Sequence, residues 1–119
     1  MQTLTNGQLY QLLPALSTII AKDIPMRIAI NLRKTLTSIK AILIDLDEIR
    51  ADKIVVHTSQ DDKGKDIIDE VAFAADMEIM LKETSEIDIH QVNTSEFPDD
   101  FPISTADLDI LLETSILTE

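Results

Sequence analysis

Acidic side chains come closest to a catalytic pattern in this chain of 119 residues. Among its 22 Asp and Glu residues, the candidate carboxylate pairs lie within Asp45, Asp47 and Glu48 in one stretch and Asp99-Asp100 in another. A carboxylate pair acts as general acid and base only when a cleft holds both groups and shifts their pKa values. On a helix, Asp45 and Asp47 point about 160° apart. We therefore expect a solvated acidic face here and no catalytic pair.

The segment from Ser59 to Glu70 has partial similarity to a calcium-binding EF-hand loop. Gly64 and Glu70 match the sixth and twelfth places of such a loop, and Asp61 matches the third. Lys63 occupies the fifth place, where calcium requires an oxygen ligand, and its ammonium group repels the cation. We expect no calcium site.

Other catalytic and cofactor-binding patterns are missing from the sequence. His57 and His90 are the only histidines, and neither has a second histidine or a cysteine at the spacing of a zinc ligand pair. The chain has no cysteine, and its two glycines are too few for a phosphate-binding loop. No serine lies in a G-x-S-x-G elbow. We expect a protein that is not an enzyme and binds no cofactor or metal.

Apolar periodicity predicts one mainly α domain, residues 1–119, with a minor short β element. The expected elements are a helix over 5–22, a long helix over 25–56, a polar loop over 58–66, a third helix over 66–83, a short strand over 86–92 and a last helix over 104–113.

The stretch from Pro25 to Val56 predicts the longest element. Its apolar residues recur in steps of three and four, which places them on one helix face. Proline is well tolerated in a first helical turn, and no glycine interrupts the run. Such a helix is roughly 45–50 Å long, which exceeds the width of a compact domain of this size. We expect an antiparallel helical hairpin or bundle around this central helix.

Local signals refine the other elements. Thr5 is expected to cap the first helix and Pro14 to kink it. Ser104, with Asp107 three residues later, predicts the start of the last helix. Residues 114–119 are expected to form a loose tail. In the third helix, the residues assigned to the buried side are Ile67, Ile68, Val71, Ala75, Ile79 and Met80.

The net charge of −12 is unevenly distributed. Residues 1–44 carry a net charge of +4, and residues 45–119 carry −16. Acidic surfaces repel nucleic-acid phosphates and anionic membranes, whereas they attract basic proteins. We therefore expect a basic protein partner, no direct nucleic-acid binding and no membrane binding. Solubility alone is the alternative explanation of the charge. Neither a signal peptide nor a membrane-spanning run is present, which predicts a cytoplasmic protein.

Two aromatic residues form a separate candidate. Phe97 and Phe101 each precede a proline, and Asp99-Asp100 lies between them. One interpretation is an acidic-aromatic segment that docks into a basic groove. The alternative is that both rings close over the helical core.

Several segments carry a resemblance to a known family. They are the LTN-like start in LTNGQLYQLLPALSTII, the proline-started IPMRIAINLRKTL, the alternating EIDIHQV and the closing ISTADL at 103–108. In this order, and with a charged loop and a third helix between them, the chain resembles a family of small bacteriophage-encoded proteins of unknown function. The similarity covers nearly the whole chain. It implies a bacteriophage origin and transfers no catalytic residue.

Two functional hypotheses follow. The first is an acidic, non-enzymatic protein-binding module that docks on a basic, nucleic-acid-binding host or defence protein and inhibits it as a charge mimic. The second is a virion structural or assembly protein, such as a head, neck or tail component, that forms homo-oligomers through the long helix. The candidate partner-binding residues are Asp45, Asp47, Glu48, Asp52, Asp76, Glu78, Phe97, Asp99, Asp100 and Phe101.

Overall fold

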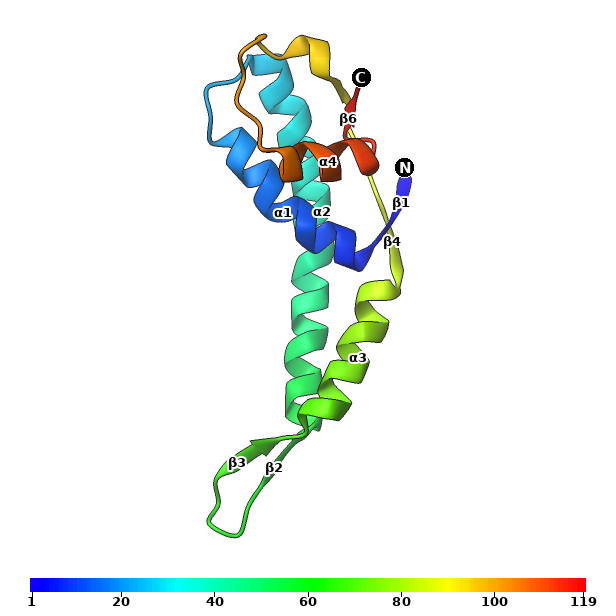
Figure 1. Cartoon of the computed structure of the whole chain (residues 1–119). Helices are drawn as coiled ribbons and strands as arrows, with labels where there is room; N and C mark the ends of the chain where they lie inside the picture. The colour runs from blue at the N-terminus through cyan, green and yellow to red at the C-terminus, as the bar shows by residue number, and fades with distance from the viewer.

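A computed structural model describes all residues, 1–119, and confirms a mainly α protein with a few short strands (Figure 1). The helices are α1 (Asn6–Ile20), α2 (Met26–Val56), α3 (Glu70–Lys82) and α4 (Thr105–Glu113). The strands are β1 (Gln2–Thr5), β2 (Thr58–Gln60), β3 (Asp66–Ile68), β4 (Thr84–Ile87), β5 (Val92–Asn93) and β6 (Leu117–Thr118), and a 3-10 turn covers Thr94–Glu96.

The molecule is elongated, and α2 sets its length. Its extents are 62 × 26 × 21 Å, and its Cα radius of gyration is 18.0 Å. A compact chain of this length would have a radius of gyration of about 13.5 Å. Figure 1 shows a wider upper part and a narrow lower part along α2. We call residues 1–46 and 83–119 the lobe, and residues 47–82, which extend below it, the arm.

The hydrophobic core lies in the lobe. Apolar residues three and four apart on α1 and on the first part of α2 face each other, as their spacing predicted. The core also receives residues from α4 and from the chain end. Its main members are Leu9, Leu12, Leu16, Ile19, Ile28, Leu32, Leu36, Ile39, Leu43, Leu46, Leu111, Ile116 and Leu117. By contrast, α3 contains no buried residue. None of the helices combines the length and apolar character needed to cross a membrane.

The helix starts at Thr5 and Ser104 agree with the sequence. The Thr5 hydroxyl accepts a hydrogen bond of 3.2 Å from the Gln8 N–H, and the Gln8 side chain accepts one of 2.9 Å from the Thr5 N–H. Ser104 Oγ accepts a bond of 3.2 Å from the Asp107 N–H. Pro14 lies on the exposed side of α1, and the helix continues past it to Ile20.

The segment predicted as a loop over 58–66 is a β-hairpin, so the third helix starts later than predicted. β2 pairs antiparallel with β3, from Thr58 opposite Ile68 to Gln60 opposite Asp66. Gly64 has a φ of 76°, a left-handed conformation that glycine adopts without strain. The chain becomes helical only at Glu70. The prediction was wrong because pairing across the turn, which local periodicity does not reveal, holds residues 66–68 extended.

The buried side assigned to the third helix was also wrong. The side chains of Val71 and Ile79 are 83 % and 61 % exposed. The half-buried apolar residues of α3 are Ala72, Phe73, Met77 and Met80, so of the α3 residues assigned to the buried side only Met80 was correct. Because α3 carries apolar residues all around its circumference, periodicity alone does not select the side that faces α2.

The strand predicted over 86–92 is divided between two pairings. β4 pairs antiparallel with β1, with Ile87 opposite Gln2. β5 pairs parallel with β6, with Val92 opposite Leu117. The loose tail predicted for residues 114–119 was therefore wrong. Ile116 and Leu117 are buried in the core because the Val92 N–H donates a hydrogen bond of 3.0 Å to the Ile116 carbonyl and β6 continues this pairing.

Asn6 fixes the joint between the lobe and the arm. Its side chain is buried, and its Nδ2 donates a hydrogen bond of 2.8 Å to the carbonyl of Met80 on α3. Its Oδ1 accepts a bond of 2.6 Å from the hydroxyl of Ser85. Its backbone N–H donates a bond of 2.8 Å to the carbonyl of Glu83. The start of α1 therefore holds the end of α3 in place.

Candidate protein-binding surface

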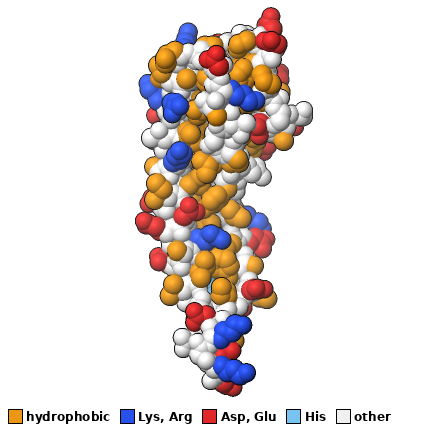
Figure 2. Space-filling model, turned by 90° about the vertical axis from the view of Figure 1, so that its left-hand side faces the viewer, with side chains coloured by type: hydrophobic (Ala, Val, Ile, Leu, Met, Phe, Trp, Pro, Cys, Tyr) orange, Lys and Arg blue, Asp and Glu red, His pale blue; other side chains and the backbone are white.

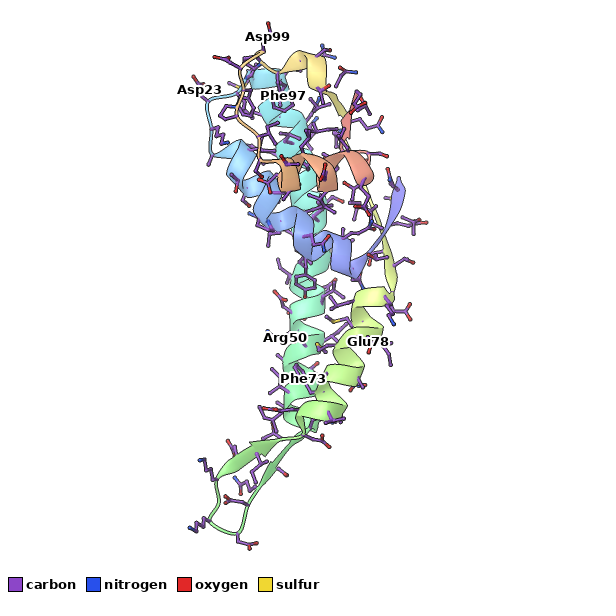
Figure 3. All side chains as sticks on the ribbon, viewed as in Figure 1. Asp23, Arg50, Phe73, Glu78, Phe97 and Asp99 are labelled. Atoms are coloured by element: carbon purple, nitrogen blue, oxygen red, sulfur yellow. The ribbon has the colours of Figure 1, made fainter.

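The candidate residues named from the sequence do not form one site. Figure 3 shows Asp99 at the upper end of the lobe and Glu78 on α3 in the arm. The acidic residues of α2 from Asp45 to Asp52 lie at the start of the arm or just before it. The acidic-aromatic segment and the helix-borne carboxylates therefore belong to different surfaces.

The aromatic residues of the lobe lie over the core. Phe97 belongs to the core cluster and is 8 % exposed, so it has almost no surface to offer a partner. Phe101 is half-buried, with its ring centroid 5.0 Å from that of Phe97. The Lys22 ammonium group lies 5.6 Å from the centroid of the Phe101 ring. Asp99 and Asp100 between them are exposed. This arrangement agrees with the interpretation that the rings cover the helical core.

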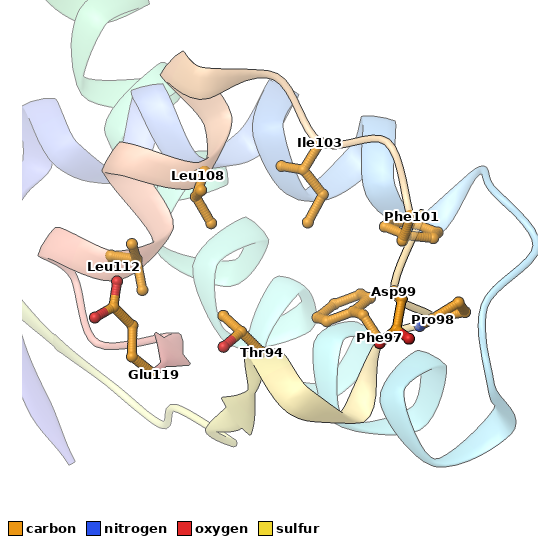
Figure 4. A pocket seen from close by; sticks show the side chains of 9 residues that line it. All are labelled: Thr94, Phe97, Pro98, Asp99, Phe101, Ile103, Leu108, Leu112 and Glu119. Atoms are coloured by element: carbon orange, nitrogen blue, oxygen red, sulfur yellow. The ribbon is translucent and has the colours of Figure 1, made fainter.

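A cavity of about 470 Å³ lies beside these rings (Figure 4). Its walls are mostly aliphatic and aromatic, and its polar groups are one hydroxyl and two carboxylates. It has room for an apolar group, and it holds no nucleophile beside a base. The lining residues are Thr94, Phe97, Pro98, Asp99, Phe101, Ile103, Leu108, Leu112 and Glu119.

The acidic residues of α2 point in two directions. Asp45, Glu48 and Asp52 are exposed and follow the spacing of one helix face. Asp47 points to the other side, where its Oδ1 accepts a hydrogen bond of 2.9 Å from the Tyr10 hydroxyl. Burial first, and then this bond to the Asp47 carboxylate, raise the pKa of Tyr10 to about 12. Asp47 therefore contributes to the contact between α1 and α2.

Two of the three acidic residues of α3, Asp76 and Glu78, have partners within the chain. The Asp76 carboxylate lies 2.6 Å from His57 Nε2 and 3.8 Å from the Lys53 ammonium group. The hydrogen bond to His57 is the largest of the effects that lower the pKa of Asp76. Glu78 pairs at 2.8 Å with Lys82, one helical turn away on an exposed face. Asp76 therefore holds α3 against α2.

A groove of about 460 Å³ runs between α2 and α3 next to the start of α1. On α3, Phe73, Met77 and Met80 follow the spacing i, i+4 and i+7 of one helix face. Two charged residues from α2 border the apolar lining. The lining residues are Tyr10, Asp47, Arg50, Phe73, Met77, Met80 and Leu81. This groove was not predicted from the sequence, although the helical spacing of Phe73, Met77 and Met80 was a signal for it.

The arm exposes many other apolar side chains. Figure 2 shows hydrophobic side chains along the middle of the lower half of the molecule, with acidic side chains on both sides. Contiguous exposed apolar surface of this kind marks interaction sites. The large apolar residues of the arm with more than a third of their surface exposed are Ile49, Val55, Val56, Ile67, Ile68, Val71, Ile79 and Leu81.

Comparison with known proteins gives no match to a protein-family model, a curated protein or a solved structure. No group of three or more His, Asp or Glu side chains is placed to hold a metal ion.

Proposed function

We propose that this chain is a non-enzymatic protein-binding module, built as a helical bundle around α2, whose arm docks on a basic protein. The observation that carries this proposal is the apolar groove between α2 and α3, located on an arm with ten acidic and five basic residues. Apolar lining favours a partner that buries apolar side chains, and the net charge of −5 favours a basic one.

The groove suits an amphipathic helix as its occupant. Helices commonly dock by placing an apolar face into a groove between two other helices. Met77 and Met80 are flexible and polarisable, so they adapt to the side chains of a partner. A docked helix would also cover apolar surface on α3, which by itself buries no residue completely. Lys and Arg residues along the edges of the partner helix would face the acidic side chains of the arm.

The biological setting belongs to the same proposal. We place the protein in the cytoplasm of a bacteriophage-infected cell, in line with the resemblance of its segments to small bacteriophage-encoded proteins. A basic, nucleic-acid-binding host or defence protein has the required charge. In one version of the proposal, Asp45, Glu48 and Asp52 imitate nucleic-acid phosphates and the protein acts as an inhibitor.

The test is affinity capture from infected-cell lysate with the tagged protein and two variants of α3. Met77→Gln places a polar side chain in the groove, whereas Val71→Gln makes a polar change at a position that is 83 % exposed. We expect the wild type and Val71→Gln to capture the same basic protein, and Met77→Gln to lose it. Capture of the basic protein by Met77→Gln at the level of Val71→Gln and the wild type would contradict docking in the groove.

Mimicry of nucleic acid is tested by a separate experiment. Duplex DNA should elute the captured protein if the acidic face of α2 occupies its nucleic-acid site. Simultaneous charge reversal of Asp45, Glu48 and Asp52 should then abolish capture. Capture that survives this reversal and resists elution by DNA would rule out mimicry and leave docking in the groove intact.

A second candidate function is structural, as a component of the head, neck or tail of a virus particle. The observation that favours it is the rod-like shape, 62 Å long, with one face of α2 exposed along the whole helix. This function predicts that the protein is present in purified particles. Its absence from them, determined by mass spectrometry, would exclude the structural function.

A further inference from the structure

The side of α2 that faces away from the core is exposed from one end of the helix to the other. Successive residues of an α-helix are rotated by about 100°, so the side opposite the buried residues is defined by their spacing. All the residues on that opposite side are exposed, and one of them, Arg27, forms an ion pair of 3.6 Å with Glu96 of the 3-10 turn. We call these residues the outer stripe: Arg27, Ile30, Lys34, Thr37, Ala41, Ile44, Glu48, Ala51 and Val55.

The outer stripe has the spacing of a coiled-coil seam. Its residues alternate in steps of three and four over the whole helix, which is the heptad pattern. Ile30, Ile44 and Val55 are 45 %, 60 % and 73 % exposed, so the stripe offers apolar side chains at its ends and centre. Ala41 and Ala51 are small and allow close approach of a second helix.

The charge of the stripe reverses near its middle. Lys34 and Glu48 each lie seven residues from Ala41, on opposite sides. Other exposed residues beside the stripe extend this reversal. The basic ones are Arg33 and Lys40, and the acidic ones are Asp45 and Asp52. Basic residues in the N-terminal half of a helix and acidic ones in the C-terminal half oppose the helix dipole, so this order is unfavourable for the isolated helix.

We propose that two copies of this chain associate through their outer stripes, with the two α2 helices antiparallel and the two-fold axis between Ala41 and Ile44. A two-fold interface requires a surface that is complementary to itself. In this arrangement Lys34 of one copy is within reach of Glu48 of the second copy, and Ile30 lies beside Val55. The same contacts occur twice, once on each side of the axis.

Charge excludes other occupants of the stripe. Parallel pairing would place Lys34 against Lys34 and Glu48 against Glu48, and like charges at neighbouring positions repel. A uniformly basic helix would be repelled by the first half of the stripe, and nucleic acid would be repelled by the second half. A second, antiparallel copy places its acidic half opposite the basic half of the first copy, and its basic half opposite the acidic half.

The dimer does not depend on the proposed docking in the groove. The groove uses Asp47 and Arg50 of α2, which are not part of the outer stripe, so both surfaces can be occupied at once. The dimer does compete with mimicry of nucleic acid, because it pairs Glu48 and brings Asp45 and Asp52 close to basic residues of the second copy.

The first test is a charge exchange measured by sedimentation equilibrium. Lys34→Glu and Glu48→Lys should each raise the dissociation constant of the dimer about tenfold, because each introduces repulsion at two symmetric contacts. The double variant should restore the wild-type value. The control is Lys63→Glu, the same charge change in the turn of the β2–β3 hairpin, which should leave the constant unchanged. A monomeric wild type, or a double variant weaker than either single variant, would overturn the proposal.

The second test measures direction. The chain has no cysteine, so a spin label attached to a Val55→Cys variant is the only label in each copy. Antiparallel copies would hold the two labels about 37 Å apart, and parallel copies about 10 Å apart. The short distance would overturn the proposal. Met77→Gln should leave the mass of the dimer unchanged, so loss of docking and loss of the dimer are distinguishable.

Discussion

The hydroxyl of Tyr10 on α1 donates a hydrogen bond of 2.9 Å to Oδ1 of Asp47 on α2, at the point where the arm leaves the lobe. Tyr10 is the only tyrosine of the chain. Burial and the Asp47 carboxylate both disfavour the phenolate, and together they raise the pKa of Tyr10 to about 12. The bond therefore requires a protonated Tyr10.

The titration of Tyr10 follows from this bond. The Tyr10 hydroxyl binds its proton more tightly in the folded state than in the unfolded state. The protonated hydroxyl therefore stabilises the fold fully below about pH 10, and this stabilisation is lost as the pH rises toward about 12. A spectrophotometric titration of the phenolate should have its midpoint near the upper value. Asp47→Asn should lower the midpoint but leave it above 10, because burial is the larger cause. A wild-type midpoint near 10 would contradict the packing of Tyr10.

The contact between Asp76 and His57 predicts that the arm is sensitive to acid. The pKa of Asp76 is lowered in the folded state, so its stabilising effect is present above the pKa of the unfolded chain, about 3.9. It is lost as the pH falls through the lower folded value. Asp76→Asn should therefore increase the rate of amide hydrogen exchange in α3 at neutral pH. The protection of α3 in this variant should also change less than that of the wild type when the pH is lowered. Glu78→Gln, which removes only an exposed pair, should change exchange little.

Asn6 predicts coupling between the lobe and the arm. Asn6→Ala removes the donor to the Met80 carbonyl and the acceptor of the Ser85 hydroxyl. We expect a loss of about 1–3 kcal/mol in the free energy of unfolding, because buried polar groups lose their partners. Chemical denaturation measures this loss, and Gln11→Ala on the exposed side of α1 is the control. A loss equal to that of the control would show that the joint does not depend on Asn6.

The location of the core predicts that stability resides in the lobe. Leu32 is fully buried, so Leu32→Ala should cost about 2–5 kcal/mol of unfolding free energy. Ile79 on the arm is 61 % exposed, and Ile79→Ala should change the free energy by less than about 0.5 kcal/mol. Thermal or urea unfolding of both variants provides the comparison. Similar losses would mean that the arm holds a core of its own.

The end of the chain is expected to be essential for stability. Ile116 is fully buried, and Leu117 pairs with Val92 in the parallel β5–β6 ladder. Ile116→Ala should therefore cost about 2–5 kcal/mol, like other large-to-small changes in a core. Removal of Glu119 alone, which is exposed, serves as the control. A tolerated Ile116→Ala substitution would restore the earlier prediction of a loose tail.

Local patterns in the sequence located three of the four helices, α1, α2 and α4, and the caps at Thr5 and Ser104. Ile28, Leu32 and Ile39 follow the helical repeat, and their spacing alone located the buried side of α2 in the lobe. The caps at Thr5 and Ser104 depend on residues within three positions, so they are readable from the chain. The acidic candidates on α2 and α3 were also recognisable, because charge is a property of composition.

Only the tertiary structure decided the remaining features. The pairings of β1 with β4 and of β5 with β6 join residues far apart in sequence, and backbone hydrogen bonds leave no local signature. The groove needs Tyr10, Asp47 and Phe73 from three different helices to converge. The side of α3 that faces α2 was undecided, because its apolar residues surround the helix. Periodicity reports what one element is able to bury, whereas packing between elements determines what it does bury.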